Sequence, residues 1–247
     1  MTSLRQENVG HVRVLSLSRP ERRNAIDQGL ADELSAAFEA LEADRSVRAV
    51  VLAGDGGYFS AGTDLTSTSP PRTEGGAYGF LARVRRKPLI AAVEGFAFGG
   101  GFECVLACDL VVASREARFG LPEVKRGLVA NSGALFRAPA RLPLNLATEM
   151  LLTGDPIGAE RAHLHGLVNE LAEPGQALDT ALALAERIVV NSPDAVQQSL
   201  HAIAVEVAER EERGWELTRA ADDENAGSPD RAEGVQAFFE KRAPNWA

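Results

Sequence analysis

Glu103 and the glycines just before it are the residues of this chain best suited to chemistry. A hydrophobic run at 89–93 predicts a short buried strand, and residues 102–107 predict the first turns of a helix. Three glycines, 99–101, stand between them, although glycine costs backbone entropy and brings no side chain to a core. Such a run indicates that a ligand approaches a helix N-terminus, where free N–H groups attract negative charge. With a carboxylate beside them, these donors predict an oxyanion site with an acid or base attached.

Two other interpretations fit parts of this segment. Glycines at a strand-to-helix turn can serve tight packing alone, and Glu103 would then be an ordinary first-turn acid favoured by the helix dipole. A dinucleotide-binding loop is excluded, because Cys104 stands where the third glycine belongs and no acid ends a following strand at the expected distance. The packing and oxyanion interpretations both stay open from this segment alone.

A second stretch of small residues strengthens the oxyanion interpretation. An apolar run at 47–52 predicts a strand, and a glycine-rich turn follows it. After the turn come Ser60, Ala61 and Gly62, which again allow a ligand close to the backbone. The whole segment at 59–65 reads FSAGTDL.

FSAGTDL, followed by GFAFGGGFE at 95–103, resembles the enoyl-CoA hydratase/isomerase family, the crotonase superfamily. The resemblance covers essentially the whole chain, with RPERRNA at 19–25, FGLPE at 119–123, LLTG at 151–154 and AFFEKR at 237–242. Each motif is weak alone, but their common order is specific. The resemblance implies an α/β crotonase fold, in which repeated β-β-α turns are followed by a helical C-terminal region that mediates trimer formation.

The same resemblance implies an acyl-CoA thioester as substrate and no separate cofactor, since coenzyme A is part of the substrate. By motif position, the N–H groups of Thr63 and Gly100 would stabilise an enolate oxygen. Glu103 and Glu123 occupy the two glutamate positions of the family's hydratases, whereas isomerases generally keep only the second. The pair favours reversible addition of water to a 2-enoyl-CoA. A surface acid after Pro122 is the alternative for Glu123.

Contacts to coenzyme A are also implied by motif position. The expected set is Arg22, Arg23, Ala25, Ala61, Asp64 and Leu65, with Phe238 and Lys241 contributed by a neighbouring subunit. Two residues depart from the family pattern and bear on acyl-chain specificity. Thr63 replaces the small residue often found there, and Asn131 falls near the aspartate nucleophile of dehalogenating relatives. A carnitinyl-CoA-type dehydratase, an enoyl-CoA isomerase and a non-catalytic RNA-binding or scaffold protein stay open as alternatives.

Composition and the distribution of residue types limit the classes of binding partner and the cellular location that we expect. A net charge of −9 argues against general binding to nucleic acid or an anionic membrane. The four histidines lack metal-ligand spacing, so no metal is expected, and the cysteines Cys104 and Cys108 suit a reduced core. The first ten residues have no apolar signal core, and no run approaches the roughly 20 apolar residues that span a bilayer. We therefore expect a cytoplasmic protein.

The order of predicted elements divides the chain. Strands and helices alternate to about residue 172, which suggests parallel strands with covering helices, and the rest is helical. We expect a core with the active site at 1–174 and a helical region at 175–247, assembled as a homotrimer or hexamer. Residues 66–79, rich in Ser, Thr, Pro and Gly, predict a loop that is either a lid over the substrate or plain surface.

Overall fold

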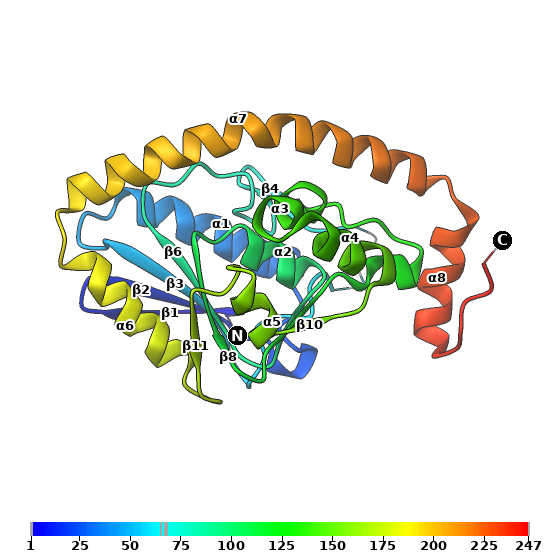
Figure 1. Ribbon diagram of the computed structural model, residues 1–247, viewed down its shortest axis with the longest axis horizontal. Coiled ribbons are helices and arrows are strands. Elements are labelled where there is room, and N and C mark those ends of the chain that lie inside the picture. Colours follow the sequence, from blue (N-terminus) through cyan, green and yellow to red (C-terminus); the bar gives the residue numbers. More distant parts are fainter. Residues whose placement is uncertain (1, 65, 67–68, 247) are drawn as a thin grey trace.

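The computed structural model describes residues 2–64, 66 and 69–246, and a six-stranded sheet lies at its centre (Figure 1). The strands lie in the order β1 (Leu4–Val9), β2 (Val12–Leu17), β3 (Ala49–Gly54), β6 (Leu89–Val93), β8 (Leu110–Ser114) and β11 (Glu170–Ala172). β1 and β2 form an antiparallel hairpin, and the later neighbours are parallel. The runs on either side of Gly10 predict this hairpin, and the structure confirms it. The parallel pairs need long crossover connections, and α1 (Gln28–Ala43) supplies the one between β2 and β3.

A second, three-stranded sheet contains the strand that leads into the glycines at 99–101. It contains β7 (Phe96–Phe98), β9 (Arg118–Gly120) and β10 (Ile157–Gly158). Gly95, with φ of 58°, turns the chain out of β6 and into β7, and α2 (Gly100–Leu106) follows at once. β6 and β8 therefore join the large sheet, and the strands that follow them, β7 and β9, join the small sheet. This is the expected β-β-α turn, and it ends with the start of α2 at the edge of the small sheet.

Helices cover both faces of the large sheet. α1 (Gln28–Ala43) begins at Asp27, whose side chain accepts a hydrogen bond from the N–H of Leu30 at 2.9 Å. α1, α2, α3 (Ala134–Arg141) and α4 (Leu144–Thr153) bury their apolar faces in the main core. α6 (Ala177–Val189) covers the other face through alanines that allow close approach. α5 (Ala159–Leu164) ends just before Gly166.

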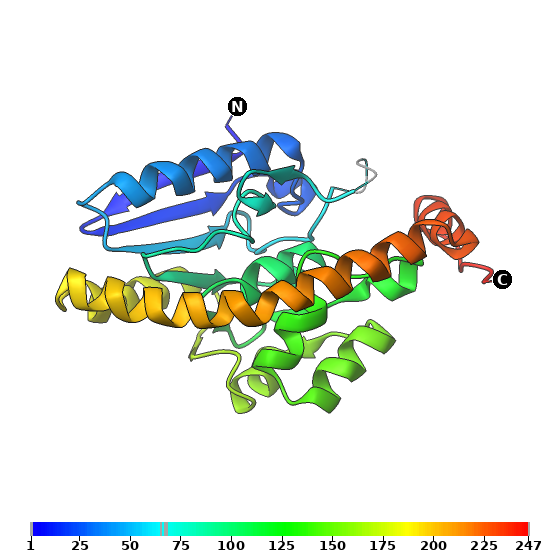
Figure 2. The ribbon, with the colours of Figure 1, turned by 90° about the horizontal axis from the view of Figure 1, so that it is seen from above.

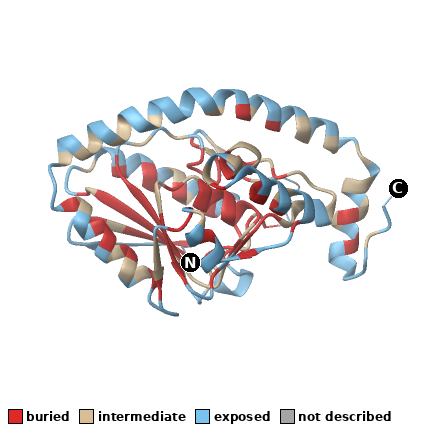
Figure 3. Ribbon diagram, viewed as in Figure 1, coloured by how far each residue is buried: buried red, intermediate tan, exposed pale blue. Residues whose placement is uncertain are grey.

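The C-terminal helices form an arch over this core. α7 (Pro193–Ala226) is 34 residues long and crosses the whole molecule (Figures 1 and 2). Most of α7 is exposed (Figure 3), and its buried residues are Gly214 and Thr218. α8 (Pro229–Glu240) then packs against the 3-10 turn η2 (Pro122–Arg126). The far end of the chain is thereby brought beside Glu123.

Two predictions of secondary structure need correction. Residues 66–79 are not a continuous loop, because β4 (Arg72–Thr73) and β5 (Gly76–Ala77) form a short hairpin and Tyr78 beyond it is fully buried. The stretch at 167–171 predicts a strand, but β11 begins only at Glu170, since Leu167 and Val168 turn into the main core instead. Tyr78, Leu167 and Val168 all pack in the main core, among residues distant in sequence.

Candidate active site

Two glycine-containing segments meet at the N-terminus of α2. Gly62 has φ of 92°, and a Cβ built on it would lie 2.7 Å from the nitrogen of Gly100 and 2.7 Å from the oxygen of Phe98. Any side chain at Gly62 would therefore push the segments apart. The N–H of Phe98 also donates to the oxygen of Ser60 at 3.0 Å. These contacts bring Thr63 next to Gly100, as the motifs predict.

The N–H groups of Thr63 and Gly100 are free to bind a ligand. The N–H of Ile26 donates to the oxygen of Gly62 at 2.8 Å, and the N–H of Asp64 donates to the oxygen of Ile26 at 3.0 Å. The N–H of Thr63, between them, takes no part in this pairing. Gly100 is the first residue of α2, where an N–H has no intrahelical partner. Within the described residues, neither N–H makes a hydrogen bond. Two unpaired donors side by side can bind a negatively charged oxygen.

Glu103 lies one turn further along α2 and is fully buried. Its Oε1 accepts hydrogen bonds from the N–H groups of Ser132 at 2.7 Å and Ala134 at 3.1 Å, at the N-terminus of α3. Gly133, with φ of 116°, makes the turn that aims these two donors. Burial raises the pKa of Glu103 to about 6, and the two hydrogen bonds and the charge of Arg137 oppose that rise.

Glu123 has fewer stabilising contacts. It lies in η2 above Gly99, where a built Cβ would stand 3.1 Å from Glu123 Oε1. Its Oε2 is buried and has no hydrogen-bond partner among the residues that the structure describes. Burial, and then the negative charge of Glu103, raise the pKa of Glu123 to about 8. The pKa of Glu123 therefore lies above that of Glu103, so Glu123 is the residue of the pair that holds a proton more readily.

A cavity of about 930 Å³ contains both carboxylates and both oxyanion donors. The predicted residues that line it are Arg22, Arg23, Ala25, Ala61, Thr63, Asp64, Gly100, Glu103, Glu123 and Phe238. Leu65 lies outside the described residues. Lys241 is not among the lining residues; it ends α8 in a left-handed conformation with φ of 54°. Phe238 reaches the cavity of its own chain, so its presence there needs no second subunit.

Several residues of the site were missed by the sequence reasoning. Tyr78 lines the cavity, but it follows a glycine-rich segment that predicted a loop. Arg126 stands one turn after Glu123 in η2, and its guanidinium lies 4.7 Å from the ring centre of Phe238. The N–H donors at the start of α3 were also missed, although Gly133 was a signal for a tight turn there.

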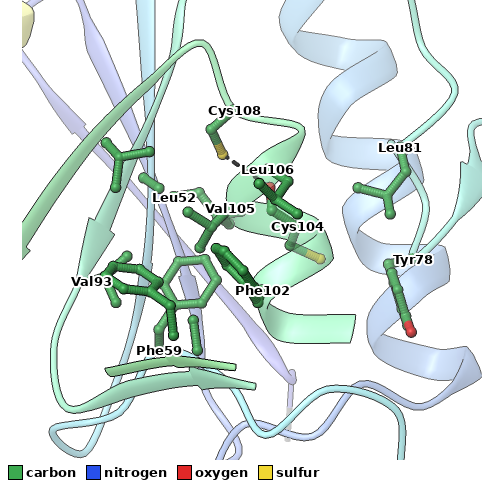
Figure 4. Close-up of a cluster of buried hydrophobic side chains, with 14 of the residues drawn as sticks. Leu52, Phe59, Tyr78, Leu81, Val93, Phe102, Cys104, Val105, Leu106 and Cys108 are labelled. Atoms are coloured by element: carbon green, nitrogen blue, oxygen red, sulfur yellow. Dashed lines mark hydrogen bonds between the residues drawn. The ribbon is translucent and has the colours of Figure 1, made fainter. Parts of the chain in front are cut away.

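The two departures from the family pattern have structural partners. The amide nitrogen of Asn131 donates to Asp222 Oδ2 of α7 at 3.0 Å, and both side chains line the cavity. Thr63 Oγ1 lies 2.7 Å from the hydroxyl oxygen of Tyr78. Figure 4 shows the Tyr78 ring beside α2, with its hydroxyl at the end of the helix where Phe102 lies. Both departures therefore add polar groups to the lining of the cavity.

Other classes of site find no support in the described ranges 2–64, 66 and 69–246. No helix there combines the length and the apolar character needed to cross a membrane. No group of three His, Cys, Asp or Glu side chains there could hold a metal ion. Cys104 and Cys108 are buried, as predicted.

Comparison with known proteins agrees with this geometry. The family described as enoyl-CoA hydratase/isomerase matches residues 7–247. Mevalonyl-coenzyme A hydratase sidH of Aspergillus fumigatus is 37% identical, over 96% of this chain and 91% of its own. Enoyl-CoA hydratase EchA19 of Mycobacterium tuberculosis is 38% identical, over 97% and 94%. The crystal structure of carnitinyl-CoA hydratase from Mycobacterium avium, 40% identical, superposes with a TM-score of 0.95 over 100% of this chain and 98% of that one. The chain belongs to the enoyl-CoA hydratase/isomerase family and has the crotonase fold.

Proposed function

We propose that this chain is an enoyl-CoA hydratase, which adds water reversibly to the double bond of a 2-enoyl-CoA thioester. One observation carries the proposal. Two carboxyl groups that differ in proton affinity, Glu103 and Glu123, line one cavity beside two unpaired N–H groups. Hydration needs a base, an acid and a site for negative charge, and this cavity supplies all three.

The oxyanion site would make the substrate reactive. A carbonyl conjugated to a double bond can be attacked at Cβ if its oxygen accepts charge as an enolate. In the proposal, the N–H groups of Thr63 and Gly100 donate to that oxygen. Loss of one such donor typically costs about 2.7–4 kcal/mol of transition-state stabilisation.

The difference in proton affinity decides which carboxyl group acts as the base and which as the acid. Ionised Glu103 accepts a proton from water as the oxygen bonds to Cβ, and protonated Glu123 gives its proton to Cα. The product gains one hydrogen and one hydroxyl, and a proton must then pass from Glu103 to Glu123 to restore the enzyme. Dehydration of a 3-hydroxyacyl-CoA, the reaction of the dehydratase alternative, is the same path reversed.

The rest of the cavity suits an anionic carrier. Arg22 and Arg23 bring positive charge to the cavity lining in a chain whose net charge is −9. In the proposal they bind the phosphates of coenzyme A, with Lys241 of a neighbouring subunit, and the enzyme needs no cofactor beyond its substrate. We also propose a cytoplasmic location, as the sequence led us to expect.

We extend the proposal to assembly as a homotrimer or hexamer. α7 leaves large apolar side chains exposed, among them Ile203 at 60% and Leu217 at 54%. Such a row on one long helix is suited to burial against further copies of the chain. Sedimentation should report a closed trimer or hexamer. A folded and active monomer at micromolar concentration would refute this part.

The activity is tested directly with crotonyl-CoA and a panel of longer and branched 2-enoyl-CoAs. Hydration removes the absorbance of the conjugated thioester, and 3-hydroxyacyl-CoAs test the reverse direction. We expect turnover of at least one substrate. Absence of turnover across the panel, together with salt-dependent binding of RNA, would replace the enzyme by the non-catalytic alternative.

A further inference from the structure

Tyr78 is a buried polar residue of the cavity that the hydration mechanism above does not use. Only 1% of its surface is exposed, and it lines the cavity together with Thr63, Gly100 and Glu103. Its hydroxyl oxygen lies 2.7 Å from Thr63 Oγ1. A Cβ built on Gly100 would stand 2.0 Å from the same oxygen. The hydroxyl therefore lies against the two residues whose N–H groups form the oxyanion site.

The hydroxyl groups of Tyr78 and Thr63 have one more proton than their mutual hydrogen bond needs. Tyr78 and Thr63 carry one hydroxyl proton each, and the hydrogen bond between them uses one. Burial and the charge of Glu103 raise the pKa of Tyr78 well above its usual value, so the phenol keeps its proton. When Tyr78 donates to Thr63 Oγ1, the hydroxyl proton of Thr63 is not used in that bond. It remains available to a ligand, next to the backbone N–H of the same residue.

A second arrangement of these hydroxyl protons competes with the first. Tyr78 also contacts the hydroxyl of Ser132, which in turn donates to Asn131 Oδ1 at 3.3 Å. Thr63 could then donate to Tyr78, and Tyr78 to Ser132. Because hydroxyl protons rotate, a negative charge at the oxyanion site would reverse the direction of this chain. A hydrogen bond to an ion is roughly twice as strong as one between neutral groups. Donation toward the enolate would therefore be favoured over donation toward Ser132.

We propose that the Tyr78–Thr63 hydroxyl pair supplies a third hydrogen bond to the thioester oxygen, and that this bond strengthens as the enolate forms. The inference rests on the proposed oxyanion site and adds a side-chain donor to its two backbone donors. It also gives Thr63 a reason to replace a smaller residue, since alanine or glycine would have no hydroxyl to offer.

A packing role for Tyr78 makes a different prediction. The phenol ring fills space beside α2, and Tyr78→Phe keeps that ring while removing the hydroxyl. If packing were the whole role, Tyr78→Phe would turn over substrate like the wild type. The chain provides a matched control in its other tyrosine. Tyr58 packs against Phe96 with ring centres 5.0 Å apart and is not among the residues that line the cavity.

The first experiment measures kcat and KM on the best 2-enoyl-CoA of the panel. A full oxyanion donor is worth roughly 10²–10³ in kcat, and a shared side-chain donor should give roughly 10–100-fold. We expect Tyr78→Phe and Thr63→Val each to lower kcat by that factor with little change in KM. The double variant should lose no more than the larger single loss, because both changes break the same chain of hydroxyls. Thr63→Ser should retain more activity than Thr63→Val, and Tyr58→Phe should match the wild type.

The second experiment separates this inference from the proposed activity. Acetoacetyl-CoA ionises to an enolate, whereas coenzyme A alone has no thioester oxygen. Tyr78→Phe should weaken binding of acetoacetyl-CoA by roughly 10-fold or more and leave binding of coenzyme A unchanged. One outcome is that the wild type hydrates no substrate while Tyr78→Phe still weakens binding of acetoacetyl-CoA and not of coenzyme A. That result would refute the proposed hydratase activity and support the third hydrogen-bond donor. If Tyr78→Phe and Thr63→Val keep wild-type kcat or the wild-type ratio of the two affinities, the third donor is refuted. Thr63→Val decides the matter alone if Tyr78→Phe does not fold.

Discussion

Glu103 and Glu123 present the same carboxyl group in two different surroundings. At the N-terminus of α3, Glu103 receives two backbone N–H bonds and the nearby charge of Arg137. In η2, Glu123 has one oxygen that is buried and has no hydrogen-bond partner among the described residues, and its ionised form is favoured by its own backbone N–H and by the charge of Arg126. Hydrogen bonds to the ionised form lower the pKa of a carboxyl group, and burial without them raises it. One residue type can therefore serve as base and acid in the same cavity.

The α7 helix takes part in this difference. Arg137 of α3 is buried and makes two hydrogen bonds to Glu211 of α7, at 2.7 Å and 2.6 Å. The guanidinium is thereby held where it favours the ionised form of Glu103. The C-terminal helices thus help to set the proton affinity of Glu103.

Replacing either carboxyl group should have the largest effect. Glu103→Gln and Glu123→Gln keep the size and some hydrogen bonding but remove the acid or base, so each should lower kcat by roughly 10²–10⁴-fold. Binding of the acyl-CoA should change little, because the amide still fills the same place. Steady-state kinetics and calorimetric titration check both parts. Near-normal hydration by Glu103→Gln would exclude the two-carboxyl mechanism.

The pH dependence of hydration should reflect the pKa values of both carboxyl groups. Glu103 must be ionised, so the rate falls as the pH drops through about 6. Glu123 must be protonated, so the rate also falls as the pH rises through about 8. The expected profile of kcat/KM is a bell whose two limbs belong to the coupled pair. A profile that is flat from pH 5 to 9 would contradict the assignment.

A smaller change should disturb the surroundings of Glu103 alone. Gly133→Ala places a Cβ at φ of 116° and 3.2 Å from Arg137 Nη1, which should move the N–H donors away from Glu103. We expect the pKa of Glu103 to rise, so that the acidic limb moves to higher pH while the basic limb stays. Gly175→Ala is the control, since Gly175 also has positive φ, 83°, but nothing lies within 4 Å of a built Cβ. The backbone strain, about 1–2 kcal/mol, should lower the stability of both variants, but only Gly133→Ala should shift the limb.

The mildest effect is expected far from both carboxyl groups. Lys241→Glu reverses a charge that the proposal assigns to coenzyme A, an interaction common to ground and transition states. It should therefore raise KM more than it lowers kcat. A large loss of kcat at unchanged KM would show that the residue acts elsewhere.

Local sequence predicted the scaffold of the site better than its environment. The apolar run of β6, the glycines that begin α2 and the position of Glu103 are all local features, and they were predicted correctly. Tyr78 was missed because its burial depends on packing against elements distant in sequence. The unequal proton affinities could not be predicted either. They depend on Ser132 and Ala134, about 30 residues after Glu103, and on the burial of Glu123 Oε2.

Exchange of an α-proton with solvent tests the central assignment most directly. Butyryl-CoA has no double bond to hydrate, so uptake of deuterium at Cα reports only the group that moves a proton there. Mass spectrometry should find deuterium uptake in D₂O with the wild type and with Glu103→Gln, but not with Glu123→Gln. Uptake that survives Glu123→Gln and is lost in Glu103→Gln would reverse the roles of acid and base and contradict this account.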